Sequence, residues 1–148
     1  MGFSMKQKPE NLVLSVPSHP KYLQLVRKMV KKITAIIGIS KPDAADIILA
    51  VDEACANSIR HGYKNQPHGM IHLYFEVHAT KLAITIEDFG CPWDPAARPP
   101  RDLEEIRPGG LGIHMMQCVM DCVDFDCDAA GTGNRVKMVK RFNPREKP

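Results

Sequence analysis

Two neighbouring segments, in which apolar and polar residues alternate strictly, constrain the fold of this chain more than any other feature. In Met70–His78 apolar side chains recur at every second residue, and the same period returns in Lys81–Asp88. A period of two places successive side chains on opposite faces of a strand, so each segment has one apolar face. Because only Ala79 and Thr80 separate the segments, we predict an antiparallel hairpin with one buried face.

Two helical segments precede the hairpin and can cover its apolar face. The range Pro20–Gly38 carries apolar residues at a helical period and ends at a glycine, a residue that commonly terminates helices. A second helix begins after Ser40, which forms an S-x-x-D capping box with Asp43. We expect this helix to run to about His61, with Gly62 as its stop.

The rest of the chain adds a strand at the start and a helix with a hairpin at the end. The first strand is expected at Leu12–Val16, the helix at Ile113–Cys122, and the last two strands at Val123–Asp128 and Arg135–Phe142. Strands and helices are therefore segregated along the chain. This order predicts an α+β fold, a two-layer α/β sandwich whose mixed, mainly antiparallel sheet has helices on one face.

Composition and charge narrow the class of protein. The 148 residues are 44% hydrophobic and 25% charged, which suits one core over residues 12–142 between tails of 1–11 and 143–148. A net charge of +3 without a basic stripe argues against a nucleic-acid partner. No apolar run is long enough for a membrane span and no secretory signal is visible, so we expect no membrane association and a cytoplasmic location.

The five cysteines are odd in number and form no CxxC pair. Three of them, Cys118, Cys122 and Cys127, are close enough in sequence to raise a zinc site. However, the first two fall in the predicted helix and the third in a strand. We therefore predict buried free thiols rather than metal ligands.

Four short motifs are candidates for chemistry. Glu53, Asn57 and His61 are spaced by four, which places a carboxylate, an amide and an imidazole on one face of the second helix. On spacing alone, a solvated polar face is the commoner explanation. Each later motif alone is also typical of a turn or a helix entry, and there is no P-loop. The later motifs are Asp88-Phe89-Gly90, Gly109-Gly110-Leu111-Gly112 and Gly131-Thr132-Gly133.

In their order, these motifs resemble those of the GHKL superfamily, which has the Bergerat ATP-binding fold. Within it, the chain is similar to the bacterial anti-sigma factor serine/threonine kinases. Val51–Tyr63, VDEACANSIRHGY, resembles the N-box of that family, and DFG with the following WDP resembles its D-x-G…FDP box. GGLGI and GTG resemble its two later glycine boxes. The resemblance extends from Leu12 to Phe142.

The resemblance implies a role for each of these residues. Glu53 would be the general base, Asn57 the Mg²⁺ ligand, and Asp88 the acceptor for the adenine amino group with Thr132 in support. For His61 a structural role and a phosphate contact both remain open. The residues implied in nucleotide binding are Asn57, His61, Asp88, Gly90, Gly110, Leu111, Gly112, Ile113 and Thr132.

The resemblance also implies an activity and partners. The family picture is an ATP- and Mg²⁺-dependent protein serine/threonine kinase that phosphorylates an anti-sigma-factor antagonist, sequesters a sigma factor and forms a homodimer. One alternative is a switch kinase of a stress-signalling scaffold that binds no sigma factor. Another is a nucleotide-gated binding module without kinase activity, against which the presence of both Glu53 and Asn57 argues.

Overall fold

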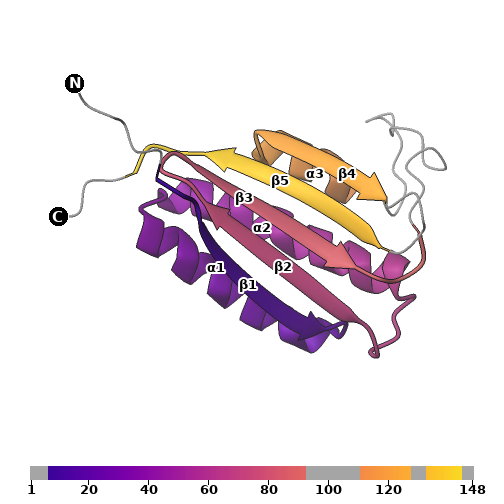
Figure 1. Ribbon diagram of the computed structural model, residues 1–148. Helices are drawn as coiled ribbons and strands as arrows, with labels where there is room; N and C mark the ends of the chain where they lie inside the picture. The colour runs from indigo at the N-terminus through magenta and orange to yellow at the C-terminus, as the bar shows by residue number, and fades with distance from the viewer. Residues whose placement is uncertain (1–6, 93–110, 128–132, 145–148) are drawn as a thin grey trace, which may run out of the picture.

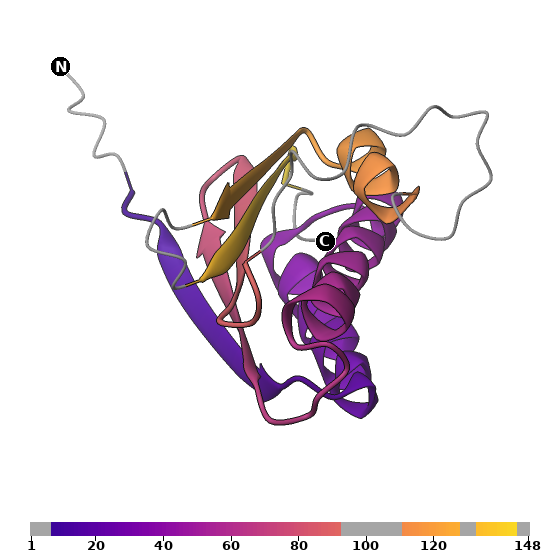
Figure 2. The ribbon, with the colours of Figure 1, turned by 90° about the vertical axis from the view of Figure 1, so that its right-hand side faces the viewer.

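The described residues form a sheet of five strands with helices packed on one face (Figures 1 and 2). A computed structural model describes residues 7–92, 111–127 and 133–144. The predicted α+β, two-layer architecture is confirmed, and every strand pair among these residues is antiparallel. Across the sheet the strands are β1 (Glu10–Pro17), β2 (Met70–Val77), β3 (Lys81–Asp88), β5 (Asn134–Arg141) and β4 (Cys122–Cys127).

The hairpin predicted from alternation forms with one face in the core. Leu73 of β2 lies opposite Ile86 of β3, and Phe75 lies opposite Ile84. All four side chains are essentially inaccessible to solvent. The apolar face of this hairpin is therefore part of the sheet face on which the helices pack.

In the described part of the chain, three α-helices lie on this face of the sheet (Figure 2): α1 (Leu23–Ile37), α2 (Lys41–Asn57) and α3 (Leu111–Val119). A single 3₁₀ turn, η1 (Pro20–Tyr22), leads into α1, which ends at Gly38 with a φ of 85°. Ser40 caps α2 as predicted, because its hydroxyl oxygen accepts a hydrogen bond from the backbone N–H of Asp43. None of the helices in the described ranges is long and apolar enough to cross a membrane.

The end of α2 differs from the prediction. α-Helical bonding stops at Asn57, and the chain continues as one π-helical turn, η2 (Ser58–Gly62). The backbone N–H of Tyr63 donates to the carbonyl of Ser58, five residues earlier, at 2.9 Å. π-Turns are rare and occur often at functional sites. This turn widens the helix end and alters the direction in which the side chains after Asn57 project.

The third helix ends earlier than expected, at Val119 rather than Cys122. The backbone N–H of Asp121 donates to the carbonyl of Val139 in β5, so sheet pairing takes over and Cys122 opens β4. Cys118 and Cys122 are free thiols as predicted, but the expectation of burial was wrong, because both are exposed. No cluster of metal-ligating side chains occurs within the described part of the chain.

Candidate functional site

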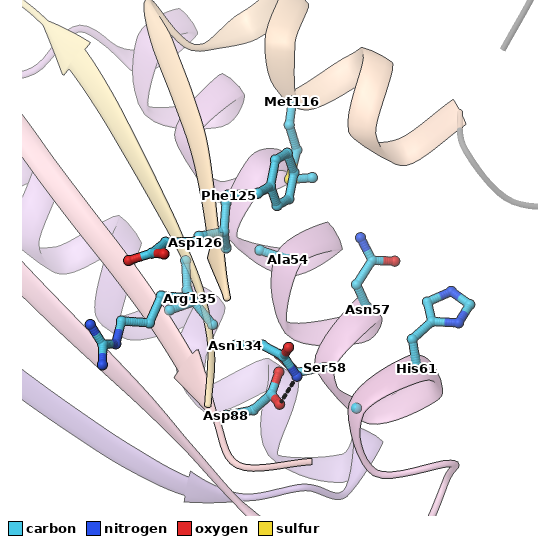
Figure 3. Close-up of a pocket in the computed structure, with 13 residues that line it drawn as sticks. Ala54, Asn57, Ser58, His61, Asp88, Met116, Phe125, Asp126, Asn134 and Arg135 are labelled. Carbon is cyan, nitrogen blue, oxygen red and sulfur yellow. Dashed lines mark hydrogen bonds between the residues drawn. The ribbon is translucent and has the colours of Figure 1, made fainter. Parts of the chain in front are cut away.

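An open pocket lies where α2 and η2 meet the ends of β3 and β5 (Figure 3). It encloses about 460 Å³ of empty space, part of it open to solvent. α3 and β4 complete its wall. Its lining residues are Ala54, Asn57, Ser58, His61, Gly62, Ile86, Asp88, Met116, Phe125, Asp126, Asn134, Arg135 and Val136.

The interior surface of the pocket is mainly apolar. Phe125 of β4 and Met116 of α3 lie at one end, whereas Asn57 and His61 lie at the mouth (Figure 3). The side chain of Arg135 points away from the pocket and pairs with Glu87 on the outer face of the sheet, with Nε and Oε2 2.8 Å apart. A slot with apolar walls and few polar groups suits a flat aromatic ligand with a polar edge.

Asp88 is the polar group at the base of this slot. It is the last residue of β3 and is only 5% exposed. Its Oδ1 accepts hydrogen bonds from the backbone N–H of Gly90 at 3.0 Å and from the side-chain amide of Asn134 at 2.9 Å. Among the described residues both of these hydrogen bonds fall on Oδ1, so Oδ2 can accept from a ligand. A buried carboxylate needs such donors, and here they also fix its direction.

Two glycines allow η2 to approach the end of β3. A Cβ added at Gly62 would lie 2.8 Å from Oδ1 of Asp88, and one added at Gly90 would overlap the backbone carbonyl of Gly62. The backbone N–H of Cys91 donates to that same carbonyl at 2.6 Å. The chain can hold Asp88 against the helix end only because neither position carries a side chain.

Tyr63 also stabilises the region where η2 meets the end of β3. Its hydroxyl donates to the carbonyl of Met70 at 2.6 Å and accepts from the backbone N–H of Phe89 at 2.8 Å. Burial raises the pKa of Tyr63 above the usual value, because the charged phenolate would lose its hydration. The hydroxyl therefore remains protonated and bridges the start of β2 and the residue that follows β3.

A second group of polar side chains lies along the C-terminal turns of α2 and in η2. Oδ1 of Asn57 and Oε1 of Glu53 both accept from Nη2 of Arg60, at 3.0 Å and 3.1 Å. Gly112, in the first turn of α3, lies against the Glu53 carboxylate so closely that an added Cβ would overlap it. The Glu53 carboxylate thus lies at the start of α3, and Arg60 joins it to the Asn57 amide oxygen.

The donor set fits a hard divalent cation. Mg²⁺ prefers carboxylate and amide oxygens and usually keeps several waters. Here a cationic nitrogen is already held between the oxygens of Glu53 and Asn57, so the place suits positive charge. The slot with Asp88 at its base and this oxygen pair are joined by one helix, α2 with its continuation η2.

The structure gathers part of the predicted site around the pocket. Asn57, His61 and Asp88 line it, whereas Glu53, Gly90 and Gly112 are outside the lining, with Gly90 against Gly62 and Gly112 against Glu53. Ile113 is half-buried and packs against the core, and Leu111 begins α3. Gly110 and Thr132 lie outside the described residues, so their roles stay predictions.

Several pocket residues were not identified from the sequence. The clearest is Asn134, whose amide donates both to Asp88 and to the carbonyl of Cys91 at 2.8 Å. Its position directly after Gly131-Thr132-Gly133 was the available signal. Phe125 could have been found from the alternation of the last hairpin. Met116 had no signal beyond its place on the apolar side of a helix.

Comparison with known proteins places this geometry in a family context. The family described as "Histidine kinase-like ATPase domain" matches residues 16–140. A protein named "Serine-protein kinase RsbW" from Staphylococcus aureus (strain JH9) is 30% identical over 150 residues, covering 95% of this chain and 94% of that protein. A protein of the same name from Bacillus licheniformis is 28% identical over 145 residues, covering 93% and 91%.

Solved structures show the same fold at lower identity. The crystal structure of the RsbU and RsbW domains of Rv1364c from Mycobacterium tuberculosis aligns with a TM-score of 0.66 and 17% identity, over 93% of this chain and 35% of that one. The mycobacterial sensor histidine kinase MprB aligns with a TM-score of 0.55 and 16% identity, over 90% of this chain and all of that one.

Proposed function

Because the chain belongs to the histidine kinase-like ATPase domain family and, within it, to the anti-sigma factor serine kinases, we propose that it transfers the γ-phosphate of ATP to a protein hydroxyl. The observation that supports this most is a single helix joining two sites of different chemistry. At one end of the pocket a buried Asp88 faces an apolar slot, and at the mouth Asn57 presents an amide oxygen, with the carboxylate of Glu53 one turn earlier on α2.

The slot is the proposed place of the adenine ring. Phe125, Met116 and Val136 supply apolar surface, and Asp88 accepts a hydrogen bond from the exocyclic amino group. Guanine carries a carbonyl at the corresponding position, which a carboxylate cannot accept from. ATP is therefore preferred over GTP. Asn134 supports the recognition indirectly, because its amide holds the Asp88 carboxylate in place.

The mouth of the pocket is the proposed place of the phosphates and of Mg²⁺. Asn57 would hold the cation through its amide oxygen, and the cation would neutralise phosphate charge when bound. The first turn of α3 brings backbone N–H groups close to Glu53, and helix N-termini favour anions. The remaining members of the proposed nucleotide-binding set are His61, Gly90, Gly110, Leu111, Gly112, Ile113 and Thr132.

Glu53 is the proposed general base. Its carboxylate takes the proton of the attacking serine or threonine hydroxyl as that oxygen bonds to the γ-phosphorus and ADP leaves. Its side chain is 25% exposed, so a protein hydroxyl can reach it from the solvent side. Phosphoryl transfer depends mainly on positioning and charge neutralisation, which a small domain can provide.

The proposed substrate is an anti-sigma-factor antagonist, and the proposed second partner is a sigma factor that the protein sequesters as a cytoplasmic homodimer. Two relatives that cover nearly the whole chain are named serine-protein kinases, which supports a protein substrate.

The test is transfer of γ-³²P from ATP to a candidate antagonist, followed by phosphoamino-acid analysis and by sigma-factor capture with ATP and with ADP. Mg²⁺-dependent phosphoserine or phosphothreonine on the antagonist is the expected result. ATP binding without any transfer to protein would overturn the kinase proposal.

A further inference from the structure

Arg60 stands at the mouth of the pocket and contacts both residues proposed to carry the chemistry. Its Nη2 lies 3.1 Å from Oε1 of Glu53 and 3.0 Å from Oδ1 of Asn57. A single donor atom therefore joins the carboxylate to the amide oxygen. The guanidinium therefore occupies space beside the Asn57 oxygen that a divalent cation would have to approach.

The backbone explains why this side chain can reach both oxygens. Glu53 and Asn57 are one turn apart on α2, and Arg60 follows in the π-helical turn η2. The long Arg60 side chain reaches back from this turn to both oxygens. Gly112 of α3 also lies against the Glu53 carboxylate, so closely that an added Cβ would overlap it. Glu53 is thus held between Arg60 and the first turn of α3.

The contact is one that a ligand can displace. The Arg60 side chain is 50% exposed and that of Glu53 is 25% exposed, so water screens their attraction. Arginine is also attached by a long flexible stem, which can swing toward solvent without disturbing the helix. The pair is therefore strong enough to orient two side chains and weak enough to open.

We propose that Arg60 is a positioning residue that holds Glu53 and Asn57 together until a divalent cation binds, and that it competes with this cation for the amide oxygen of Asn57. The inference rests on the proposed function, because it takes Asn57 as the cation ligand. Cation binding then requires Arg60 to leave, which frees the Glu53 carboxylate for a proton at the same moment. The opening of this contact links cation arrival to the availability of the base.

A second ion pair on the same helix provides a matched comparison. Arg27 of α1 pairs with Asp52 of α2, with Nε and Oδ1 2.7 Å apart and side-chain exposures of 48% and 30%. Asp52 directly precedes Glu53 in sequence. This pair has the same charges and similar exposure, but it does not contact Asn57. Replacing Arg27 by Gln changes the net charge by the same amount as replacing Arg60.

The test measures metal binding alone, in the full chain without nucleotide. Mn²⁺ is titrated and its free concentration is followed by electron paramagnetic resonance. Arg60→Gln is expected to tighten Mn²⁺ binding several-fold, whereas Arg27→Gln stays within twofold of the wild type. Arg60→Lys should stay near the wild type, because an ammonium can also lie between two oxygens. In an Asn57→Ala background the gain from Arg60→Gln should disappear.

The result of the Mn²⁺ titration can be distinguished from the result of the kinase test. The Mn²⁺ titration requires neither ATP nor a protein substrate, so it stands even if no phosphate is transferred. Equal Mn²⁺ affinities in wild type and Arg60→Gln would overturn the competition, as would an equal gain in Arg27→Gln. The absence of Mn²⁺ binding in every variant would also contradict it. A transfer assay that fails while Arg60→Gln still tightens Mn²⁺ would reject the kinase function alone.

Discussion

The two ends of the pocket are built in different ways. At the Asp88 end the contacts are short, buried and largely with backbone, and two glycines bring the helix end against the strand end. At the Glu53 end the contacts join long side chains that are one quarter to one half exposed. A rigid end suits recognition of a fixed shape, whereas a yielding end suits groups that change partners during a reaction. The comparison therefore predicts opposite responses to substitution.

The largest effect is expected for Gly90→Ala. The added methyl would overlap the backbone carbonyl of Gly62, and neither backbone can move without disturbing Asp88. We expect the free energy of unfolding to fall by about 1–3 kcal/mol, the usual cost of overpacking, and ATP binding to be lost. Urea denaturation and calorimetry measure the two quantities. Wild-type stability together with wild-type ATP affinity would contradict the rigid character of this end.

Asp88→Asn tests recognition without adding volume. The amide cannot offer a charged acceptor to the adenine amino group, and it faces the amide of Asn134. A hydrogen bond to a charged group is worth about 1.5–3 kcal/mol, so ATP affinity should fall by roughly 10- to 150-fold. The wild type should also discriminate against GTP, and Asp88→Asn should lose that preference. Equal binding of ATP and GTP by the wild type would contradict the placement of adenine in the slot.

Gly112→Ala is the matched change at the yielding end. The added methyl meets only the end of the Glu53 side chain, which can rotate away, and alanine favours a helix over glycine by about 1 kcal/mol. Stability should be unchanged or slightly higher, while phosphate transfer falls by roughly tenfold or more because the base is displaced. A loss of stability as large as that of Gly90→Ala would remove the contrast between the two ends.

The smallest effect is expected for Tyr63→Phe, which removes the hydroxyl that bridges Met70 and Phe89. The loss of stability near neutral pH should be about 1 kcal/mol. Burial raises the pKa of Tyr63 in the folded state, so its contribution is present below the unfolded pKa of about 10 and is lost as pH rises through the folded pKa. The stability difference between wild type and variant should therefore shrink in strong alkali; a difference independent of pH would argue against this bridge.

Local sequence patterns predicted the helices and strands better than the contacts and turns between them. Alternation in Met70–His78 fixed the central hairpin, and Ser40 with Asp43 marked the start of α2. The π-turn at Ser58–Gly62 was missed because a single turn with five-residue bonding has no period that a sequence can display.

Long-range contacts were missed for a different reason. Asp88 and Asn134 are direct partners across β3 and β5, but chain order does not reveal that β5 lies between β3 and β4. The resemblance therefore implied a supporting role for Thr132 at Asp88 and did not reveal the contact of Asn134 with the same carboxylate. Arg60 contacts Glu53 and Asn57 from the π-turn, and spacing alone does not distinguish such a contact from a solvated charge.

The central claim is that binding and transfer are separate tasks of the two ends. The most direct measurement determines ATP affinity and phosphorylation of the antagonist side by side in wild type, Asp88→Asn and Glu53→Gln. Glu53→Gln should keep ATP affinity within a few-fold and lose transfer by about 10²–10⁴-fold, the usual contribution of a general base. Asp88→Asn should lose affinity and recover most of its transfer rate at saturating ATP. Transfer by Glu53→Gln within tenfold of the wild type would contradict the account.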